Sequence, residues 1–326
     1  MNKEIKSLYR VHRPKTFAQV IGQDHITKTL QNQISSGKVT HAYLFCGTRG
    51  TGKTSVAKIF AREVNTGGMT PPDIFLDIFE IDAASNNSVQ DVRDLIDKVK
   101  YPPVHAKYKV YIIDEVHMFS GAAFNAFLKT LEKPPSHVIF ILCTTEPHKL
   151  LPTVQSRCLR FDFRSVATAE IEKHLAGILK KEKIDADPAA IKLLAEAGSG
   201  SVRDAMSFTE TTVAYCGQNK ITAQDVATVL GTVDRTALIS LLDAITKKET
   251  QKITKQCTDI FSKGINTNVL VKDFLTVIRQ TFMETKNPVL LYVYKIFAEL
   301  EMNIKTAPDA ATMFEGACFL AHAQNV

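Results

Sequence analysis

The sequence lacks any hydrophobic run long enough to cross a membrane. Its longest apolar runs, such as the one from Val138 to Cys143, fall far short of the roughly 20 residues that a membrane-spanning helix requires. The N-terminal stretch MNKEIKSLYRVHRP also lacks the apolar centre of a secretory signal peptide. We therefore expect a cytoplasmic protein that does not have a membrane as a partner.

Cysteine is scarce, and the six cysteines are scattered rather than grouped. No two of them stand at the spacing of metal ligands, and most have apolar neighbours. We expect reduced, buried side chains in a cytoplasmic chain of this kind. The pattern excludes a small scaffold held together by disulfides. The six residues are Cys46, Cys143, Cys158, Cys216, Cys257 and Cys318.

What the sequence does have is the composition of an ordinary globular protein. Its 326 residues are 45% hydrophobic and 23% charged, which is close to the average for folded domains. Such a chain can bury a sizeable core, so an intrinsically disordered chain is excluded. The length corresponds to two or three domains of roughly 100–200 residues each.

Positive charge is concentrated at one end of the chain. The formal net charge is +6, yet residues 1–60 hold ten lysines and arginines and only two acidic residues. The remainder of the chain is therefore slightly acidic. A basic region of this kind attracts anions, most commonly phosphates. A solvated basic surface would give the same composition, so the motifs must decide.

Residues 1–165 alternate short apolar runs with helical patterns. The runs are rich in β-branched and aromatic residues and carry few charges, which is typical of strands buried on both faces. This alternation predicts an α/β fold, in which helices cover a parallel sheet. The expected strands are Ala42–Cys46, Ile78–Asp82, Lys109–Ile113, Val138–Cys143 and Arg160–Phe163.

From about residue 166 onward the pattern is helical only. We expect helices over residues 169–182, 188–197, 201–214 and 222–230, followed by a break at Gly231. Five further helical stretches begin near Arg235, Thr250, Asn268, Pro288 and Pro308. We therefore predict an α/β core at residues 1–165, a small helical domain at 166–231, and an all-helical domain for packing or assembly at 232–326.

The stretch GTRGTGKT fits the phosphate-loop pattern G-x-x-x-x-G-K-[ST] and lies between an expected strand and a helix expected to begin near Ser55. Its glycines let the backbone wrap around phosphate oxygens, and the helix N-terminus favours negative charge. Lys53 would reach the β- and γ-phosphates, and the Thr54 hydroxyl would ligate Mg²⁺. The predicted nucleotide-binding residues here are Gly47, Thr48, Arg49, Gly50, Thr51, Gly52, Lys53, Thr54 and Ser55.

A second motif, VYIIDE, ends an apolar strand in two carboxylates. Asp114 would lie at the carboxyl edge of the sheet beside the phosphate loop, where it can support Mg²⁺. Glu115 would polarise an attacking water as a general base. An Asp-Glu pair at a strand end is often only a solvated turn, but a complete phosphate loop earlier in the chain favours the catalytic interpretation.

Three further positions carry polar side chains with an alternative structural explanation. Thr145, with Thr144, follows a buried strand and could contact the γ-phosphate or simply close a turn. Arg157 could stabilise transition-state charge or form a surface ion pair. Arg203 follows glycines in the first turn of an expected helix, where a cation is unfavourable unless an anion lies nearby. That placement favours contact with a nucleotide.

Taken together, these motifs resemble one known family. YRVHRP, VIGQ, GTRGTGKT, IIDEVHM, FNAFLKTLEKPP, CTTEPHKL, SRC and GSVRDA occur in that order, and IDAASNN is the most specific of the matching segments. The chain is similar to the gamma/tau subunits of bacterial DNA polymerase III, which are the ATPase motors of the sliding-clamp loader. The resemblance runs from about Leu8 to Gly231 and more weakly beyond.

The resemblance implies an AAA+ module with a phosphate-loop sheet, a small helical lid and an all-α collar that joins five subunits in a ring. It implies ATP and Mg²⁺ as cofactors, and delta- and delta-prime-type subunits, the sliding clamp and primed-template DNA as partners. ATP hydrolysis at subunit interfaces would then open the clamp and load it onto DNA during replication.

The resemblance also assigns roles to individual residues. Thr145 would be the first sensor of the nucleotide, and Arg203 in the lid the second. Arg157 would act on ATP held by the neighbouring subunit. Arg13, Val20 and Ile21 would pack around the adenine, and an apolar pocket independently suits a base. The predicted catalytic residues are Lys53, Asp114, Glu115, Thr145 and Arg157, and the predicted Mg²⁺ ligands are Thr54 and Asp114.

Two departures from the family matter. Relatives usually carry a four-cysteine zinc module before the IDAAS strand, but here residues 63–74 contain no cysteine, and we predict no zinc. The chain also ends after the collar-like helices, so we expect no tau-type C-terminal extension and no coupling to a polymerase through it.

DNA contacts are less clear from the sequence. The helix start after residues 84–88, and Arg93, are candidates for phosphate contacts, but capping alone explains Ser and Asn at a helix start.

Three other functions fit parts of the pattern. A nonhydrolysing scaffold subunit like delta-prime would carry a damaged phosphate loop, whereas Lys53, Thr54, Asp114 and Glu115 are intact here. A branch-migration or helicase-type AAA+ motor would lack the SRC and FNAFLKTLEKPP segments. A small-molecule kinase would need a lid that binds an acceptor.

Overall fold

The computed structural model of the chain describes residues 7–66, 74–231, 233, 235–262, 265–304 and 309–323. The chain divides into two compact units, Met1–Val213 and Ala214–Val326. The predicted division into three domains, with boundaries at residues 165 and 231, stays a prediction.

A five-stranded parallel sheet forms the centre of the first unit, with strand order β2-β3-β4-β1-β5. The strands are mostly continuous apolar runs, and β1, β4 and most of β3 are fully buried, as expected for a sheet covered on both faces. The predicted α/β class is therefore confirmed, and each expected strand is present to within one residue at either end. The strands are β1 Ala42–Cys46, β2 Ile78–Asp82, β3 Lys109–Asp114, β4 Val138–Thr144 and β5 Leu159–Asp162.

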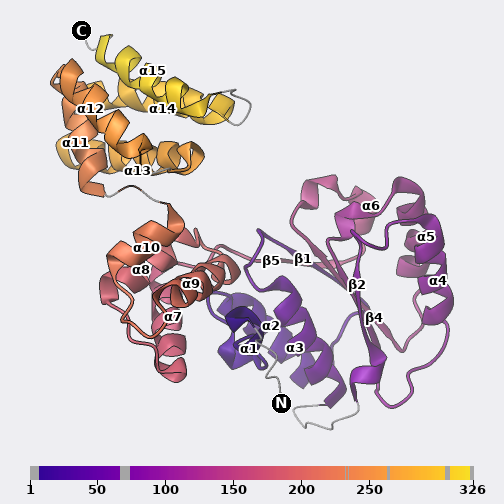
Figure 1. The fold of residues 1–326 in the computed structure, drawn as a ribbon. Helices are drawn as coiled ribbons and strands as arrows, with labels where there is room; N and C mark the ends of the chain where they lie inside the picture. The colour runs from indigo at the N-terminus through magenta and orange to yellow at the C-terminus, as the bar shows by residue number, and fades with distance from the viewer. Residues whose placement is uncertain are drawn as a thin grey trace. The chain divides into compact units, whose positions relative to one another are not determined.

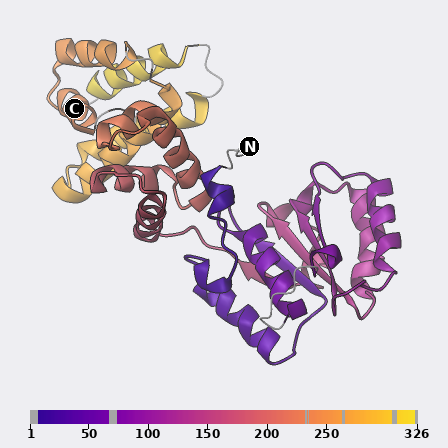
Figure 2. The ribbon, with the colours of Figure 1, turned by 60° about the horizontal axis from the view of Figure 1, so that its bottom comes forward.

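Alternate side chains of the strands supply two separate hydrophobic cores, because successive residues point to opposite faces of a sheet. On one face Tyr43 and Phe45 pack against α2 (Asp24–Ser35) and α3 (Lys53–Thr66). The ring of Tyr43 meets that of Phe60 edge-on, with 4.8 Å between centroids. Figures 1 and 2 show α2 and α3 in indigo on this side of the sheet.

On the other face Tyr111 and Phe140 pack against α4 (Val89–Val99) and α5 (Gly121–Glu132). Phe127 of α5 meets Phe140 edge-on at 5.0 Å. These two helices lie on the opposite side of the sheet from α2 and α3 in Figure 2. The carboxyl ends of the strands are thereby left as the edge where side chains from several strands can meet.

Helices α7 (Thr168–Glu182), α8 (Pro188–Ala197) and most of α9 (Val202–Cys216) complete the first unit. Buried Ile171, Leu175 and Leu194 give α7 and α8 their apolar faces. Short elements connect the layers. They are α1 Leu8–Val11, η1 Phe17–Gln19, η2 Ile74–Asp77, η3 Val116–Met118, η4 Pro147–Lys149 and α6 Pro152–Gln155.

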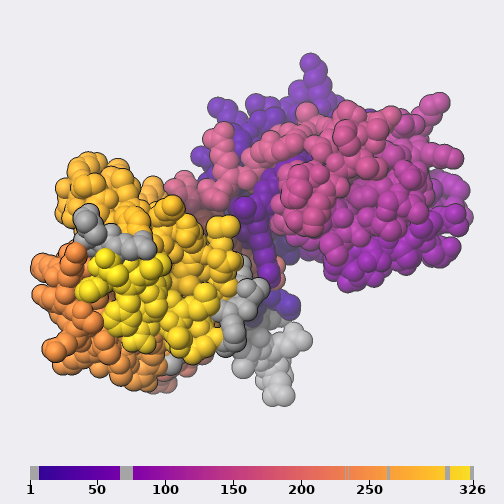
Figure 3. All heavy atoms as spheres, turned by 90° about the horizontal axis from the view of Figure 1, so that it is seen from above, coloured from indigo at the N-terminus to yellow at the C-terminus, as the bar shows by residue number. Residues whose placement is uncertain are grey.

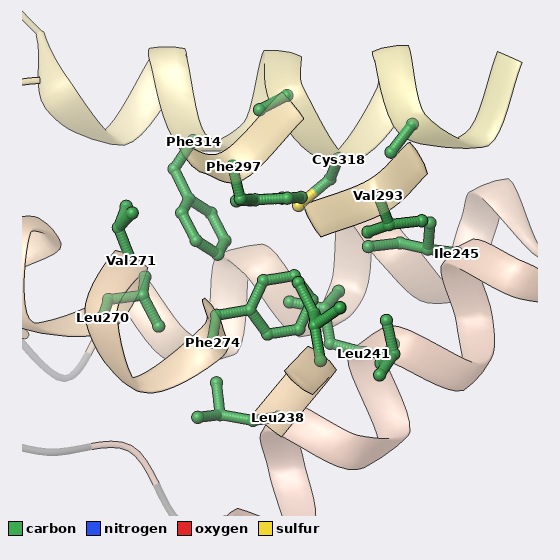
Figure 4. Close-up of a cluster of buried hydrophobic side chains, with 14 of the residues drawn as sticks. Leu238, Leu241, Ile245, Leu270, Val271, Phe274, Val293, Phe297, Phe314 and Cys318 are labelled. Atoms are coloured by element: carbon green, nitrogen blue, oxygen red, sulfur yellow. The ribbon is translucent and has the colours of Figure 1, made fainter. Parts of the chain in front are cut away.

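The second unit is built from helices around an aromatic core. Phe274, Phe297 and Phe314 meet one another at centroid distances of 4.7–5.9 Å, and Figure 4 shows them beside Leu238, Leu241 and Cys318. The orange and yellow atoms of this unit form one closely packed body in Figure 3. The helices around this core are α11 Arg235–Thr246, α12 Thr250–Phe261, α13 Thr267–Thr285, α14 Val289–Asn303 and α15 Ala310–Ala323, and α10 Ala223–Leu230 belongs to the same unit.

Several expectations from composition can be compared with the structure. All six cysteines are free, and five are buried while Cys158 is half-buried. No helix in the described part of the chain is long and apolar enough to span a bilayer. The segment on which the predicted loss of zinc chiefly depends falls at residues 67–73, outside the described residues, so that expectation stays a prediction.

Candidate functional site

A cavity of about 960 Å³ opens in the first unit, between the phosphate loop, the N-terminal segment and the start of α9. Most of the residues predicted from the sequence to bind nucleotide line this one cavity. Those at its wall are Arg13, Val20, Ile21, Arg49, Gly50, Thr51, Gly52, Lys53, Thr54, Ser55, Asp114, Glu115 and Arg203. The predicted residues that are not part of its wall are Gly47, Thr48, Thr145 and Arg157.

The phosphate loop runs from β1 directly into α3. The helix begins at Lys53, two residues before Ser55, near which its start was expected. The Nζ of Lys53 donates to the carbonyl oxygens of Gly47 and Thr48 at 2.8 and 2.9 Å. Burial lowers the pKa of Lys53, and the nearby carboxylates of Glu115 and Asp114 act in the opposite direction. Lys53 is thus held at the point where a phosphate would enter the loop.

Oxygen atoms that can bind a divalent cation lie together beside the phosphate loop. The Thr54 hydroxyl donates to Asp114 Oδ2 at 2.7 Å, which brings the ends of α3 and β3 together. Hydroxyl and carboxylate oxygens are the ligands that Mg²⁺ prefers. The two residues predicted as its protein ligands therefore lie in contact and fit such an ion.

Glu115 is held in an unusual backbone conformation. Its φ is +47°, in the left-handed region that non-glycine residues rarely adopt and that clusters at functional sites. Its Oε2 accepts hydrogen bonds from the hydroxyl of Thr145 at 2.8 Å and from the backbone N–H of Thr145 at 3.2 Å. The carboxylate predicted to be the base is thus bonded to the threonine predicted to be the first sensor.

The structure separates the roles of the two adjacent threonines. Thr145 faces Glu115, whereas the fully buried Thr144 contacts His117, with 3.0 Å between Oγ1 and Nδ1. The other ring nitrogen of His117 lies 3.1 Å from Glu146 Oε2. The sequence motifs predict no role for His117. A histidine two residues after Glu115 is the signal that could have suggested one.

The start of α9 closes the cavity from the lid side. The backbone N–H of Val202 donates to the Gly50 carbonyl at 3.2 Å, and a Cβ on Gly50 would come within 1.9 Å of Ser201 Oγ. The Arg203 guanidinium lies over the Tyr9 ring, 5.2 Å from its centroid, a favourable cation–π arrangement. Tyr9 is a second residue for which the sequence motifs predict no role.

The N-terminal segment connects the phosphate loop with the lid helices. Arg13 Nε donates to Ser55 Oγ at 3.0 Å, while His12 lies 2.6 Å from Glu182 of α7. The backbone N–H of Leu8 donates to Glu210 Oε2 at 3.2 Å. These contacts place the segment, with Val20 and Ile21 nearby, along one wall of the cavity.

Arg157 lies away from the cavity of its own chain. Its Nη2 is 2.6 Å from Glu132 Oε1, and its Nη1 donates to the Thr153 carbonyl. The side chain keeps 34% exposure, so it remains reachable from outside. The ion pair that the sequence offered as an alternative is therefore present, and action on a neighbouring subunit stays a prediction.

The candidate DNA contact at the start of α4 has a structural role. Ser88 and Asp91 form a reciprocal capping box, in which each side chain bonds the other residue's backbone N–H. Capping therefore accounts for the serine at this position. Contact of this helix, or of Arg93, with DNA stays a prediction.

A parallel sheet with a phosphate loop, a carboxylate pair at the end of β3 and a helical lid defines the AAA+ class of P-loop ATPases. Solved structures agree on the fold. The Thermotoga maritima RuvB Holliday junction branch migration motor matches 72% of this chain and 79% of its own, at 20% identity and a TM-score of 0.55. This likeness shows a common fold.

Sequence comparison identifies the family within that class. Residues 22–167 match the model described as DNA polymerase III, delta subunit. Residues 170–218 match the ATPase lid domain of DNA polymerase III clamp loader subunits, and residues 221–286 match domain III of subunits gamma and tau. Each model covers a different part of the chain, and the three follow one another in order.

Whole-chain relatives lead to the same family. DNA polymerase III subunit tau of Escherichia coli is 42% identical over 298 residues, and that of Bacillus subtilis 41%. Subunit gamma of Buchnera aphidicola is 36% identical over 93% of this chain and 86% of its own. The chain belongs to the gamma/tau family of DNA polymerase III clamp-loader subunits. It spans about half the length of the two tau subunits, 46% and 53%.

Proposed function

We propose that this chain is an ATP-hydrolysing motor subunit of a sliding-clamp loader. The observation that carries the proposal is the convergence of Lys53, Thr54, Asp114 and Glu115 on one cavity. Two of these residues begin α3 and two lie at the end of β3, and each has the chemistry that hydrolysis of a bound nucleoside triphosphate requires.

In the proposed reaction, the residues of the chain bind the triphosphate and the metal ion, and they activate the attacking water. The N–H groups of the phosphate loop and Lys53 hold the triphosphate, and Thr54 and Asp114 hold the metal ion. Bound Mg²⁺ would supply neutralisation of charge on the phosphates. Glu115 would take a proton from the attacking water, once its carboxylate is free of the two hydrogen bonds from Thr145.

The lid and the neighbouring subunit would complete the site. Arg203 reaches the cavity from α9 and would contact the nucleotide within the same chain. Arg157 would act on nucleotide bound by the next subunit in a five-membered ring. Because that arginine comes from outside, hydrolysis would depend on correct assembly with delta- and delta-prime-type subunits, the sliding clamp and primed DNA. Opening the clamp and loading it onto DNA are part of this proposal.

Point variants of the isolated chain test the nucleotide site. Lys53→Ala should abolish binding of a fluorescent ATP analogue, while Lys28→Ala, on the exposed face of α2, should bind like the native chain.

Hydrolysis is tested in the assembled ring. There Glu115→Gln should bind ATP but not turn it over. Native turnover by Lys53→Ala would disprove the proposal, and binding without turnover by the native ring would favour a scaffold subunit.

A further inference from the structure

His117 lies in a closed set of hydrogen bonds beside the candidate catalytic base. Its side chain is only 6% exposed. One ring nitrogen contacts the last residue of β4, and the other contacts the turn that follows this strand. Nδ1 lies 3.0 Å from Thr144 Oγ1, and Nε2 lies 3.1 Å from Glu146 Oε2. The imidazole therefore connects η3, which follows Glu115, to the turn that follows β4.

The directions of these hydrogen bonds follow from what each group can donate. The backbone N–H of Glu146 already donates to Thr144 Oγ1 at 3.0 Å, so the Thr144 proton is available for His117 Nδ1. Lys149 lies 2.8 Å from Glu146 Oε2 and lowers the pKa of that carboxyl, so Glu146 accepts a hydrogen bond from the Nε2–H of His117. A ring with its proton on Nε2 therefore matches the Thr144 hydroxyl as donor and the Glu146 carboxylate as acceptor.

The hydrogen bonds of His117 to Thr144 and Glu146 fix the position of Thr145, which lies between these two residues. Thr145 stands between Thr144 and Glu146, and its N–H and hydroxyl both point to Glu115 Oε2. Glu115 Oε2 is also 3.4 Å from His117 Nδ1. A shift of the turn would therefore move the threonine away from the carboxylate.

We propose that His117 is a positioning residue, which holds the turn Thr144–Glu146 so that Thr145 can orient and release Glu115. This inference rests on the proposed function, since it concerns the base of that reaction. It adds a residue that does not line the nucleotide cavity and acts through its neighbours. A purely structural role would affect folding and nucleotide affinity as much as turnover.

The main test compares His117 with His148, which both lie near the carboxylate of Glu146. His117→Gln should reduce turnover of saturating ATP in the assembled ring by about 10- to 100-fold, because misplacing a catalytic group costs this much. The affinity of the isolated chain for the ATP analogue should stay within about two-fold, since only the chemical step is affected. His148 is 3.9 Å from Glu146 Oε1 and its side chain is 73% exposed. His148→Gln should leave both quantities unchanged.

A second variant tests the same hydrogen bonds without changing His117, and a spectroscopic measurement tests them without an activity assay. Thr144→Val keeps the shape but removes the hydroxyl, and should reproduce the His117→Gln result. In the native chain without nucleotide, ¹⁵N NMR should show Nδ1 of His117 unprotonated and Nε2 protonated, and Thr144→Val should shift the Nδ1 resonance.

Four results would contradict the proposed role of His117. A proton on Nδ1, or no response of Nδ1 to Thr144→Val, would overturn the inference. So would native turnover by His117→Gln, or a loss of affinity as large as the loss of turnover. If the native chain neither binds nor hydrolyses ATP, the proposed function fails, while the NMR result still decides whether the hydrogen bonds exist.

Discussion

At the scale of single residues, Gln23 shows how one buried side chain can join distant segments. It is fully buried, donates to the Arg164 carbonyl at 2.6 Å and accepts from the Arg164 N–H at 3.2 Å. It also reaches the Thr51 carbonyl of the phosphate loop at 3.5 Å. The residue thus connects the loop with the chain that leads into α7.

Removing that side chain should destabilise the first unit. Gln23→Ala leaves the part-buried N–H and C=O of Arg164 without these partners, and we expect the free energy of unfolding to fall by about 1–3 kcal/mol. Gln31→Ala, on the exposed face of α2, should change it by less than about 0.5 kcal/mol. Urea unfolding of both variants measures the difference, and equal stabilities would contradict this account of Gln23.

At the scale of elements, the contact between the phosphate loop and α9 depends on the absence of a side chain at Gly50. Its φ is +77°, and an added Cβ would lie 1.9 Å from Ser201 Oγ. Gly50→Ala should displace the start of α9 together with Arg203. We expect the affinity for an ATP analogue to fall by about ten-fold or more, equivalent to about 1.4 kcal/mol.

A matched glycine separates this effect from a general one. A Cβ on Gly121, the first residue of α5, would meet no atom within 4 Å. Gly121→Ala should therefore bind the analogue like the native chain. Native affinity in Gly50→Ala would show that the loop and α9 do not need this close approach.

Helix α13 of the second unit contains a carboxyl group whose burial raises its pKa to about 6. Because the pKa of Asp273 is higher in the folded chain than in the unfolded chain, the folded state binds more protons between about pH 4 and 6. The contribution of Asp273 to the stability of the folded state is therefore greatest below about pH 4 and is lost as the pH rises through 6. The charge that Asp273 carries at neutral pH is unfavourable in its buried position.

Replacing Asp273 by its neutral analogue should remove this cost. Since the side chain is partly exposed, we expect Asp273→Asn to stabilise the second unit by on the order of 1 kcal/mol at pH 7.5. The gain should vanish at about pH 4, where both side chains are neutral. Thermal unfolding at the two pH values checks this, and a gain that does not change with pH would contradict it.

The sequence predicted the elements well where the signal is local. Strands such as β1 and β4 are continuous apolar runs between turns, and the helix from Pro188 to Ala197 was predicted with its observed ends. The phosphate loop was also predictable, because its eight residues are contiguous and their geometry is fixed by glycines and the following helix. Local residue types were sufficient in these cases.

The contacts that the sequence did not predict join segments far apart in the chain. His117 and Thr144 are 27 residues apart, and they meet only because β3 and β4 are neighbours in the sheet. Tyr9 meets Arg203 because the N-terminal segment lies against α9. Such contacts depend on the order of the strands and on side-chain direction, and neither follows from spacing along one sequence.

At the scale of the whole molecule, Arg157 should distinguish an isolated chain from an assembled ring. Arg157→Ala should leave the ATP affinity of the isolated chain unchanged, because this side chain does not line the chain's own cavity. Turnover in the ring should fall by about 10³-fold or more, as expected for an arginine supplied by a neighbour. Affinity and single-turnover measurements together check this.

A nearby arginine serves as the control. Arg160 pairs with Asp162 at 2.8 Å on the exposed side of β5, and Arg160→Ala should leave ring turnover unchanged. A collapse of ATP affinity in isolated Arg157→Ala would mean that Arg157 acts on its own chain's nucleotide, and the assignment to a neighbour would be wrong.

The proposed function of this chain is ATP hydrolysis that loads a sliding clamp. The most direct measurement is steady-state ATP hydrolysis by the chain mixed with its cognate loader subunits, with and without clamp and primed DNA. We predict strong stimulation when clamp and DNA are present together, because assembly completes each site. ATP binding without turnover under every condition would contradict the claim, and would mean that the intact residues of the cavity serve a scaffold.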